Sequence, residues 1–211
     1  MAMLNLPDIP AIRRLTQSLA MLDAIMSPEW EYRYYSFNSR WYTDEMMASM
    51  RDGCGDHWFL HFTPAGAFLK GFAHESPMAL NAPWPGVLDR VPPVFAGSVA
   101  EPAFMMRDTT FCFWHEAAVD EWRQGEIAFP SHPDPDGASE LLGILTDGPE
   151  WYRLWGTDYY EMEIPPAAVT AVYDFQPITE QLVLSLNPDA FIDNVIESAR
   201  EIGYPLANES A

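Results

Sequence analysis

Histidine–glutamate pairs are the residues of this 211-residue sequence best suited to metal chemistry. His74-Glu75 and His115-Glu116 resemble the first half of the zinc-binding H-E-x-x-H helix, but neither continues to the second histidine. His57 and His61 fall on one side of an expected strand, where four residues place them roughly 13 Å apart. One alternative is therefore a metal-dependent or hydrolytic enzyme with a composite site on neighbouring strands. Its ligands would be His61, His74, Glu75, His115 and Glu116.

Other catalytic patterns are weak or missing. Cys54 could act as a nucleophile with His57, but Asp52 and Asp56 beside it would raise the pKa of the thiol, which favours an ordinary tight turn. Cys112 stands between two phenylalanines, as expected of a buried strand residue. The sequence contains no phosphate-binding loop, no dinucleotide fingerprint and no G-x-S-x-G nucleophile motif. With 31 acidic residues, carboxylate pairs are expected by chance. We therefore expect a non-enzymatic protein without a cofactor.

The charge is strongly acidic and uneven. There are 31 acidic and 11 basic residues, giving a net charge of -20. Residues 1–100 hold ten acids and seven bases, whereas residues 101–211 hold 21 acids and four bases. Such a surface repels nucleic acid and anionic membranes, so neither is an expected partner. It attracts cationic proteins, although solubility alone also accounts for acidity.

Aromatic residues in the acidic half indicate where a protein partner would bind. Tryptophan and tyrosine between residues 151 and 160 lie among carboxylates, although core packing also explains aromatic clusters. We therefore predict an acidic binding protein, immunity-like or regulatory, that recognises a cationic protein. The predicted contact surface consists of Asp120, Glu121, Trp122, Glu161 and Glu163. A structural or regulatory module whose acidity serves solubility is the third alternative, and the oligomeric state is not predicted.

The first half of the chain contains the clearest secondary-structure patterns. Apolar residues at three- and four-residue spacing predict a helix over 9–26, which Asp8 caps and Pro10 begins. A strand is expected over 31–37, and Thr43 begins a short helix through Met50. Two β-like runs, 57–62 and 67–72, flank Thr63-Pro64-Ala65-Gly66 and predict a hairpin. Residues 109–114 form another strand candidate.

The remaining segments complete an α+β domain. The proline-rich stretch 77–102 is apolar enough to be an ordered loop on the core. Helices are expected over 139–146, 151–157 and 188–202, and strands over 160–164 and 169–175. Helices at both ends with strands between them predict a mainly antiparallel sheet with N-terminal and C-terminal helices packed on it. The whole chain, 1–211, is expected to form this single domain.

The cellular setting follows from what is missing. No secretory signal and no run of eighteen apolar residues is present, and two cysteines form no disulfide framework. We therefore expect a soluble cytoplasmic protein.

Several short segments resemble a bacterial family of uncharacterised cytoplasmic proteins. The resemblance rests on the segments 35–39 (YSFNS), 47–53 (MASMRDG), 71–76 (GFAHES), 186–188 (LNP) and 201–205 (EIGYP). It implies that the chain is one intact domain. It implies no activity, cofactor or catalytic residue.

Overall fold

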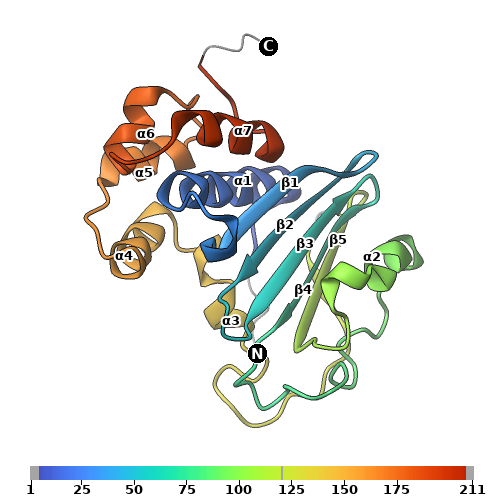
Figure 1. Ribbon diagram of the computed structural model, residues 1–211. Coiled ribbons are helices and arrows are strands. Elements are labelled where there is room, and N and C mark those ends of the chain that lie inside the picture. The colour runs from blue at the N-terminus through green and yellow to red at the C-terminus, as the bar shows by residue number, and fades with distance from the viewer. Residues whose placement is uncertain (1–4, 120, 208–211) are drawn as a thin grey trace.

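A six-stranded antiparallel sheet forms the centre of the computed structural model, which describes residues 5–119 and 121–207 (Figure 1). The spatial order of the strands, β1-β2-β3-β4-β5-β6, follows the sequence. The strands are β1 (Tyr35–Tyr42), β2 (Glu45–Arg51), β3 (His57–Thr63), β4 (Gly66–Phe72), β5 (Phe111–Glu116) and β6 (Arg123–Gln124). Both the α+β class and the antiparallel sheet with helices from both ends of the chain are confirmed.

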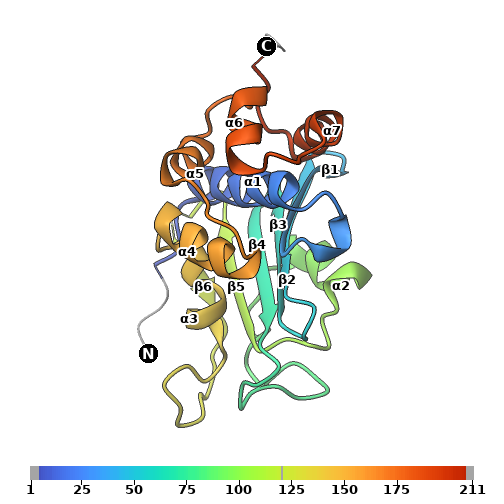
Figure 2. The same ribbon diagram turned by 60° about the vertical axis from the view of Figure 1, so that its left-hand side comes forward.

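The longer helices gather on one face of the sheet, where α1 packs on the sheet, α5, α6 and α7 contact α1, and α7 also reaches β1 (Figures 1 and 2). These are α1 (Ile9–Met26), α4 (Pro149–Tyr159), α5 (Pro166–Tyr173), α6 (Glu180–Leu186) and α7 (Ile192–Ile202). Shorter elements lie in the connections. They are η1 (Trp30–Tyr32), η2 (Pro93–Phe95), α2 (Ala96–Ala100), η3 (Pro102–Phe104), α3 (Ala138–Leu141) and η4 (Gly143–Leu145).

Helix α1 has the bounds that its apolar spacing predicted. The Asp8 carboxylate accepts a hydrogen bond from the backbone N–H of Ala11 at 2.8 Å, which satisfies one of the free donors of the first turn. Because α1 is covered from both sides, its last eleven residues are all buried. Its polar side chains form hydrogen bonds with the C-terminal helices. Gln17 donates to the carbonyl of Ile202 at 2.9 Å, and Ser18 donates to that of Val172 at 2.8 Å.

The opposite face of the sheet is covered by the connection between β4 and β5. Val87 and Phe95 from this proline-rich connection pack against Phe68 of β4 and Trp114 of β5. Nearby, Phe104 packs against Phe59. The apolar residues of the connection therefore form a second core, as expected of an ordered loop.

The helix expected over Thr43 to Met50 was wrong, because these residues turn at Asp44 and then form β2. Methionine, alanine and serine tolerate a helix, but β2 gains hydrogen bonds from β1 on one side and β3 on the other. Pairing on both sides outweighs the local preference of these residues.

The strands expected over 160–164 and 169–175 were also wrong. Residues 160–164 contain no strand, and Val169 lies in α5. Pro165 precedes this helix, and Pro166 occupies its first position, where the missing N–H does no harm. Ala168, Val169 and Val172 are the buried residues of α5, a helical spacing that outweighs the β-propensity of valine.

The C-terminal helix is shorter than expected. It begins at Ile192, because Asn187 and Pro188 belong to the turn after α6, a helix that the sequence analysis did not predict. Thr179 caps α6 by accepting a hydrogen bond from the N–H of Leu182 at 3.1 Å. Across residues 5–119 and 121–207, none of the helices has the length and apolar character that crossing a membrane requires.

Candidate functional site

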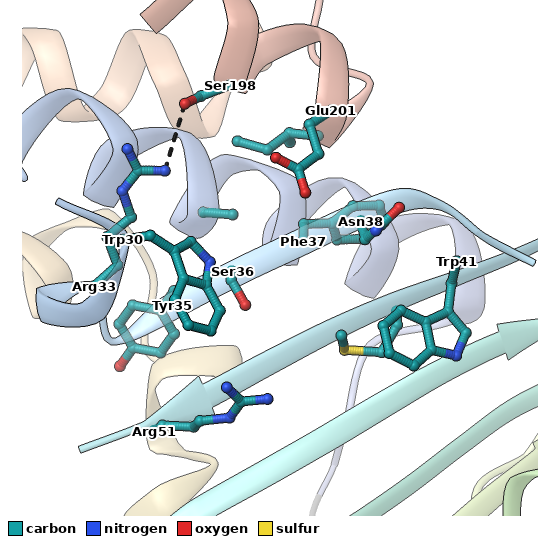
Figure 3. Close-up of a pocket in the computed structure, with 13 residues that line it drawn as sticks. Trp30, Arg33, Tyr35, Ser36, Phe37, Asn38, Trp41, Arg51, Ser198 and Glu201 are labelled. Atoms are coloured by element: carbon teal, nitrogen blue, oxygen red, sulfur yellow. Dashed lines mark hydrogen bonds between the residues drawn. The ribbon is translucent and has the colours of Figure 1, made fainter. Parts of the chain in front are cut away.

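A pocket of about 280 Å³ lies along the edge strand β1, where η1, β2 and α7 approach it (Figure 3). Two arginines, two tryptophans and the polar side chains of α7 give it its chemical character. They are Trp30, Arg33, Trp41, Arg51, Ser198 and Glu201.

Arg51 is the cation with the fewest polar partners in this pocket. Its guanidinium carbon lies 5.5 Å from the centre of the Trp30 ring and 5.2 Å from that of the Phe59 ring. Its Nε atom is buried without a hydrogen-bond partner, and no carboxylate of the described residues pairs with it. Burial accordingly lowers the pKa of Arg51 below its usual value. A half-buried cation without a counter-charge is unexpected in a chain with 31 acids.

Arg33 occupies the other end of the pocket. Its Nε donates to the carbonyl of Ser27 at 2.9 Å, and its Nη1 makes a long 3.4 Å bond to the hydroxyl of Ser198 on α7. Burial lowers the pKa of Arg33, while the carboxyl of Asp23 acts in the opposite direction. Figure 3 shows the Trp30 indole between the two guanidinium groups.

The Trp41 ring lines the same pocket, and Figure 3 shows its nitrogen on the side away from the other lining residues. The Nε1 of Trp41 is buried without a hydrogen-bond partner, and its ring stacks on Phe104 at a centroid distance of 6.3 Å. The carboxylate that lines this pocket belongs to Glu201 of α7, which is exposed. The pocket therefore offers N–H donors and aromatic surface and contains one opposing acid.

The chain's single lysine, Lys70, is fully buried and contacts the same Phe59 ring as Arg51. Lys70 Nζ donates to His57 Nε2 at 2.9 Å, to the carbonyl of Asp108 at 2.5 Å and to that of Met105 at 3.4 Å. Because His57 Nδ1 lies 3.1 Å from the carbonyl of Gly55, its proton belongs there, and Nε2 is free to accept. Burial lowers the pKa of Lys70 to about 7, and burial with the neighbouring Lys70 lowers that of His57 to about 4.

A buried carboxylate lies at the centre of the main core. Asp23 of α1 accepts from the N–H of Tyr35 at 2.7 Å and from the hydroxyl of Tyr152 at 2.7 Å. Burial raises the pKa of Asp23 to about 6, and these hydrogen bonds oppose the rise. Asp23 thus joins α1 to β1 and α4.

The predicted partner-binding residues do not form one exposed cluster. Asp120 lies outside the described residues. Trp122 is 5 % exposed and its indole donates to the carbonyl of Pro7 at 2.8 Å, so the structure corrects its placement on a contact surface. Glu121 is exposed and pairs with Arg123 at 2.7 Å. Glu161 and Glu163 are exposed in the connection between α4 and α5.

Eleven of the 21 acids of residues 101–211 lie in residues 147–202, which we call the acidic helical layer. All of its carboxylate residues are exposed, namely Asp147, Glu150, Asp158, Glu161, Glu163, Asp174, Glu180, Asp189, Asp193, Glu197 and Glu201. Its two basic residues are Arg153, which pairs with Glu150 at 2.6 Å, and Arg200. Phe191, 67 % exposed, adds apolar surface among these acids.

The composite metal site is contradicted. His61 pairs across the ladder with Phe68 and shares its face, whereas His115 pairs with Ala67 and projects from the opposite face. His74, followed by Glu75, lies beyond β4, where its Nδ1 is 2.6 Å from Asp56. Glu116 follows His115 at the end of β5. Among the described residues, no group of three histidine, cysteine, aspartate or glutamate residues could hold a metal ion.

His61 forms a different polar array. Its Nδ1 lies 2.9 Å from Ser98 Oγ and its Nε2 lies 2.9 Å from Glu45. A serine, a histidine and a carboxylate in contact are also found in the catalytic triads of hydrolases. However, Ser98 is 2 % exposed and His61 is 3 % exposed, so little of either side chain reaches the surface, although both line a pocket with Glu45. The array therefore attaches α2 to the sheet.

The Cys54 segment is the expected tight turn. One oxygen of Asp52 accepts from the N–H groups of Cys54, Gly55 and Asp56 at 2.8 to 2.9 Å. His57 bonds Gly55 and Lys70, so its ring is not positioned to activate the thiol. Cys112 is buried in β5, as predicted.

Sequence analysis did not single out Arg33 and Arg51. The available signal was their rarity, because ten arginines and one lysine face 31 acids, and Arg33 stands between two tyrosines in the sequence. Comparison with known proteins adds no assignment, since no protein-family model, no curated protein and no solved structure matches this chain.

Proposed function

We propose that this chain is a binding protein whose acidic helical layer recognises a cationic protein. The observation that carries the proposal is the exposure of all eleven carboxylate residues of this layer against two basic residues. Carboxylates that are neither buried nor widely paired act together as a negative surface, which raises the association rate of a positive partner.

Apolar side chains within the layer support a protein ligand over a small cation. Phe191 and Leu154 are 67 % and 58 % exposed, and Tyr159 and Leu184 are also exposed. Interfaces combine such apolar anchors with a charged rim that determines the rate and the choice of partner. An immunity-like or regulatory role, in which this protein covers a basic protein, fits that combination.

Charge reversal on the layer is expected to abolish salt-sensitive capture of basic proteins. The test variant is Glu161→Lys with Glu163→Lys, and the matched control is Glu75→Lys with Asp89→Lys, which makes the same change in net charge at exposed sites outside the layer. Each protein is immobilised and exposed to extract of its host at low and at high salt. The wild type and the control should retain a basic protein at low salt and release it at high salt, because screening weakens exposed charges.

Polylysine serves as the reference for unspecific attraction. Both double variants should lose the same affinity for it, because their net charges change equally. The proposal fails if both double variants capture the basic protein equally well, or if no basic protein is retained by the wild type.

A further inference from the structure

The pocket along β1 has a charge opposite to that of the surface around it. We propose that it binds an oxyanion, a carboxylate or phosphate group carried on a planar ring, with the Arg51 guanidinium as its main contact. This inference is independent of the acidic helical layer and its cationic partner.

The first argument is the missing counter-charge of Arg51. A guanidinium presents five N–H donors in a rigid fork that matches a carboxylate or phosphate. The rings of Trp30 and Phe59 contact the Arg51 guanidinium, but neither ring carries an oxygen that could accept from its N–H groups. None of the described residues forms an ion pair with Arg51, although the chain has 31 acidic and only 11 basic residues. An anion in the pocket would supply the acceptor that the protein itself does not.

The second argument is that another cation faces the same space. Arg33 donates hydrogen bonds to the carbonyls of Ser27 and Pro28, and these two bonds fix its position. Its remaining contact, to Ser198, is 3.4 Å long and lies at the weak end of hydrogen bonding. Because the guanidinium is planar, these two bonds also hold Nη1 in place, where a ligand acceptor could replace its weak bond to Ser198.

The third argument concerns size and shape. A volume of about 280 Å³ is at the low end of small-molecule sites, which favours one ring with an acidic group over a nucleotide or a peptide. Trp30 is exposed and Trp41 lines the pocket, so flat aromatic surface is available for a ring. Glu201 lies at the α7 side (Figure 3), where it opposes the anion and weakens its binding.

The full chain is titrated with each probe, and binding is measured by tryptophan fluorescence and by calorimetry. The probes are benzoate, phenyl phosphate, inorganic phosphate and benzamide, the last being the neutral isostere of benzoate. Benzoate or phenyl phosphate should bind saturably, and benzamide about tenfold more weakly or worse, because a charge-assisted hydrogen bond is lost. Tighter binding of benzoate assigns the site to carboxylates, and tighter binding of phenyl phosphate assigns it to phosphates. Inorganic phosphate should bind more weakly than phenyl phosphate, because it has no ring.

Variants locate the site and separate it from effects on folding. Arg51→Gln should weaken binding about tenfold, and Arg51→Lys should weaken it less, because the charge remains while the fork is lost. Glu201→Gln should tighten binding, since it removes the opposing charge at an exposed position. Arg14→Gln, an exposed cation on α1, is the control and should change nothing.

Three results would overturn the inference. They are equal affinity for benzoate and benzamide, unchanged affinity in Arg51→Gln, and no saturable binding of either aromatic anion by the wild type.

Discussion

Replacing Lys70 with alanine is expected to destabilise the protein by about 3 to 5 kcal/mol. The side chain is fully buried in β4, and its ammonium group provides the hydrogen bonds that His57 and the carbonyls of Met105 and Asp108 accept. Alanine leaves these acceptors without a donor and opens a cavity where the butyl chain packed. Urea unfolding followed by tryptophan fluorescence measures the change. Arg14→Ala, at an exposed cation, should alter stability by less than about 0.5 kcal/mol.

The same residue predicts how stability depends on pH. The pKa of Lys70 is lowered to about 7 in the folded protein, from 10.5. Between these values the unfolded chain binds more protons, so the free energy of unfolding should rise with pH. The slope is at most about 1.4 kcal/mol per pH unit, the value for one proton. Over pH 7 to 9, Lys70→Met should remove the rise while keeping the volume of the side chain. A wild-type profile that is flat over this range would contradict the prediction.

Asp23→Ala is expected to have the second large effect, a loss of about 3 kcal/mol or more. This carboxylate, 0 % exposed, accepts hydrogen bonds from the N–H of Tyr35 and the hydroxyl of Tyr152. Both donors are buried, so neither can bond water when the acceptor is removed. Thermal and urea unfolding measure the loss, and Tyr152→Phe, which removes one hydroxyl and keeps the ring, should cause only part of it.

The pH dependence of this site has the opposite sign. Burial raises the pKa of Asp23 to about 6, from 3.8. Between these values the folded protein retains a proton that the unfolded chain has lost, so stability should fall as pH rises. Asp23→Asn cannot ionise. The stability of the wild type relative to this variant should therefore fall by up to roughly 3 kcal/mol between pH 4 and 6. A constant difference between the two proteins over this range would show that Asp23 does not titrate there.

Segments with consistent local signals could be predicted from the sequence. Helix α1 has apolar spacing, an Asp8 cap and a proline in its first turn, and all three indicate the same bounds. The hairpin of β3 and β4 combines apolar runs with a turn sequence between them. Where tertiary contacts decide, local signals misled. Met46 to Met50 pairs with two neighbouring strands, and the valines of α5 pack against the core at helical spacing.

The pocket depends on contacts between segments that are distant in sequence. Trp30 and Arg51 meet because β1 turns back through β2, and Phe59 reaches Arg51 from β3. No short spacing pattern encodes this arrangement. The error about the histidines has the same origin, because the separation of His61 from His115 depends on the register of three strands. The acidity of the second half was visible in composition, but the burial of Trp122 was not.

The order of the strands has a consequence for the speed of folding. Each strand pairs with the one before it in the sequence, so β1 to β4 can form as successive local hairpins without long loop closure. Two steps require distant segments to meet. The connection 73–110 must close before β5 pairs with β4, and α1 must bond α7, as Gln17 does with Ile202. We expect these two closures to limit the folding rate, with the β1–β4 meander formed first.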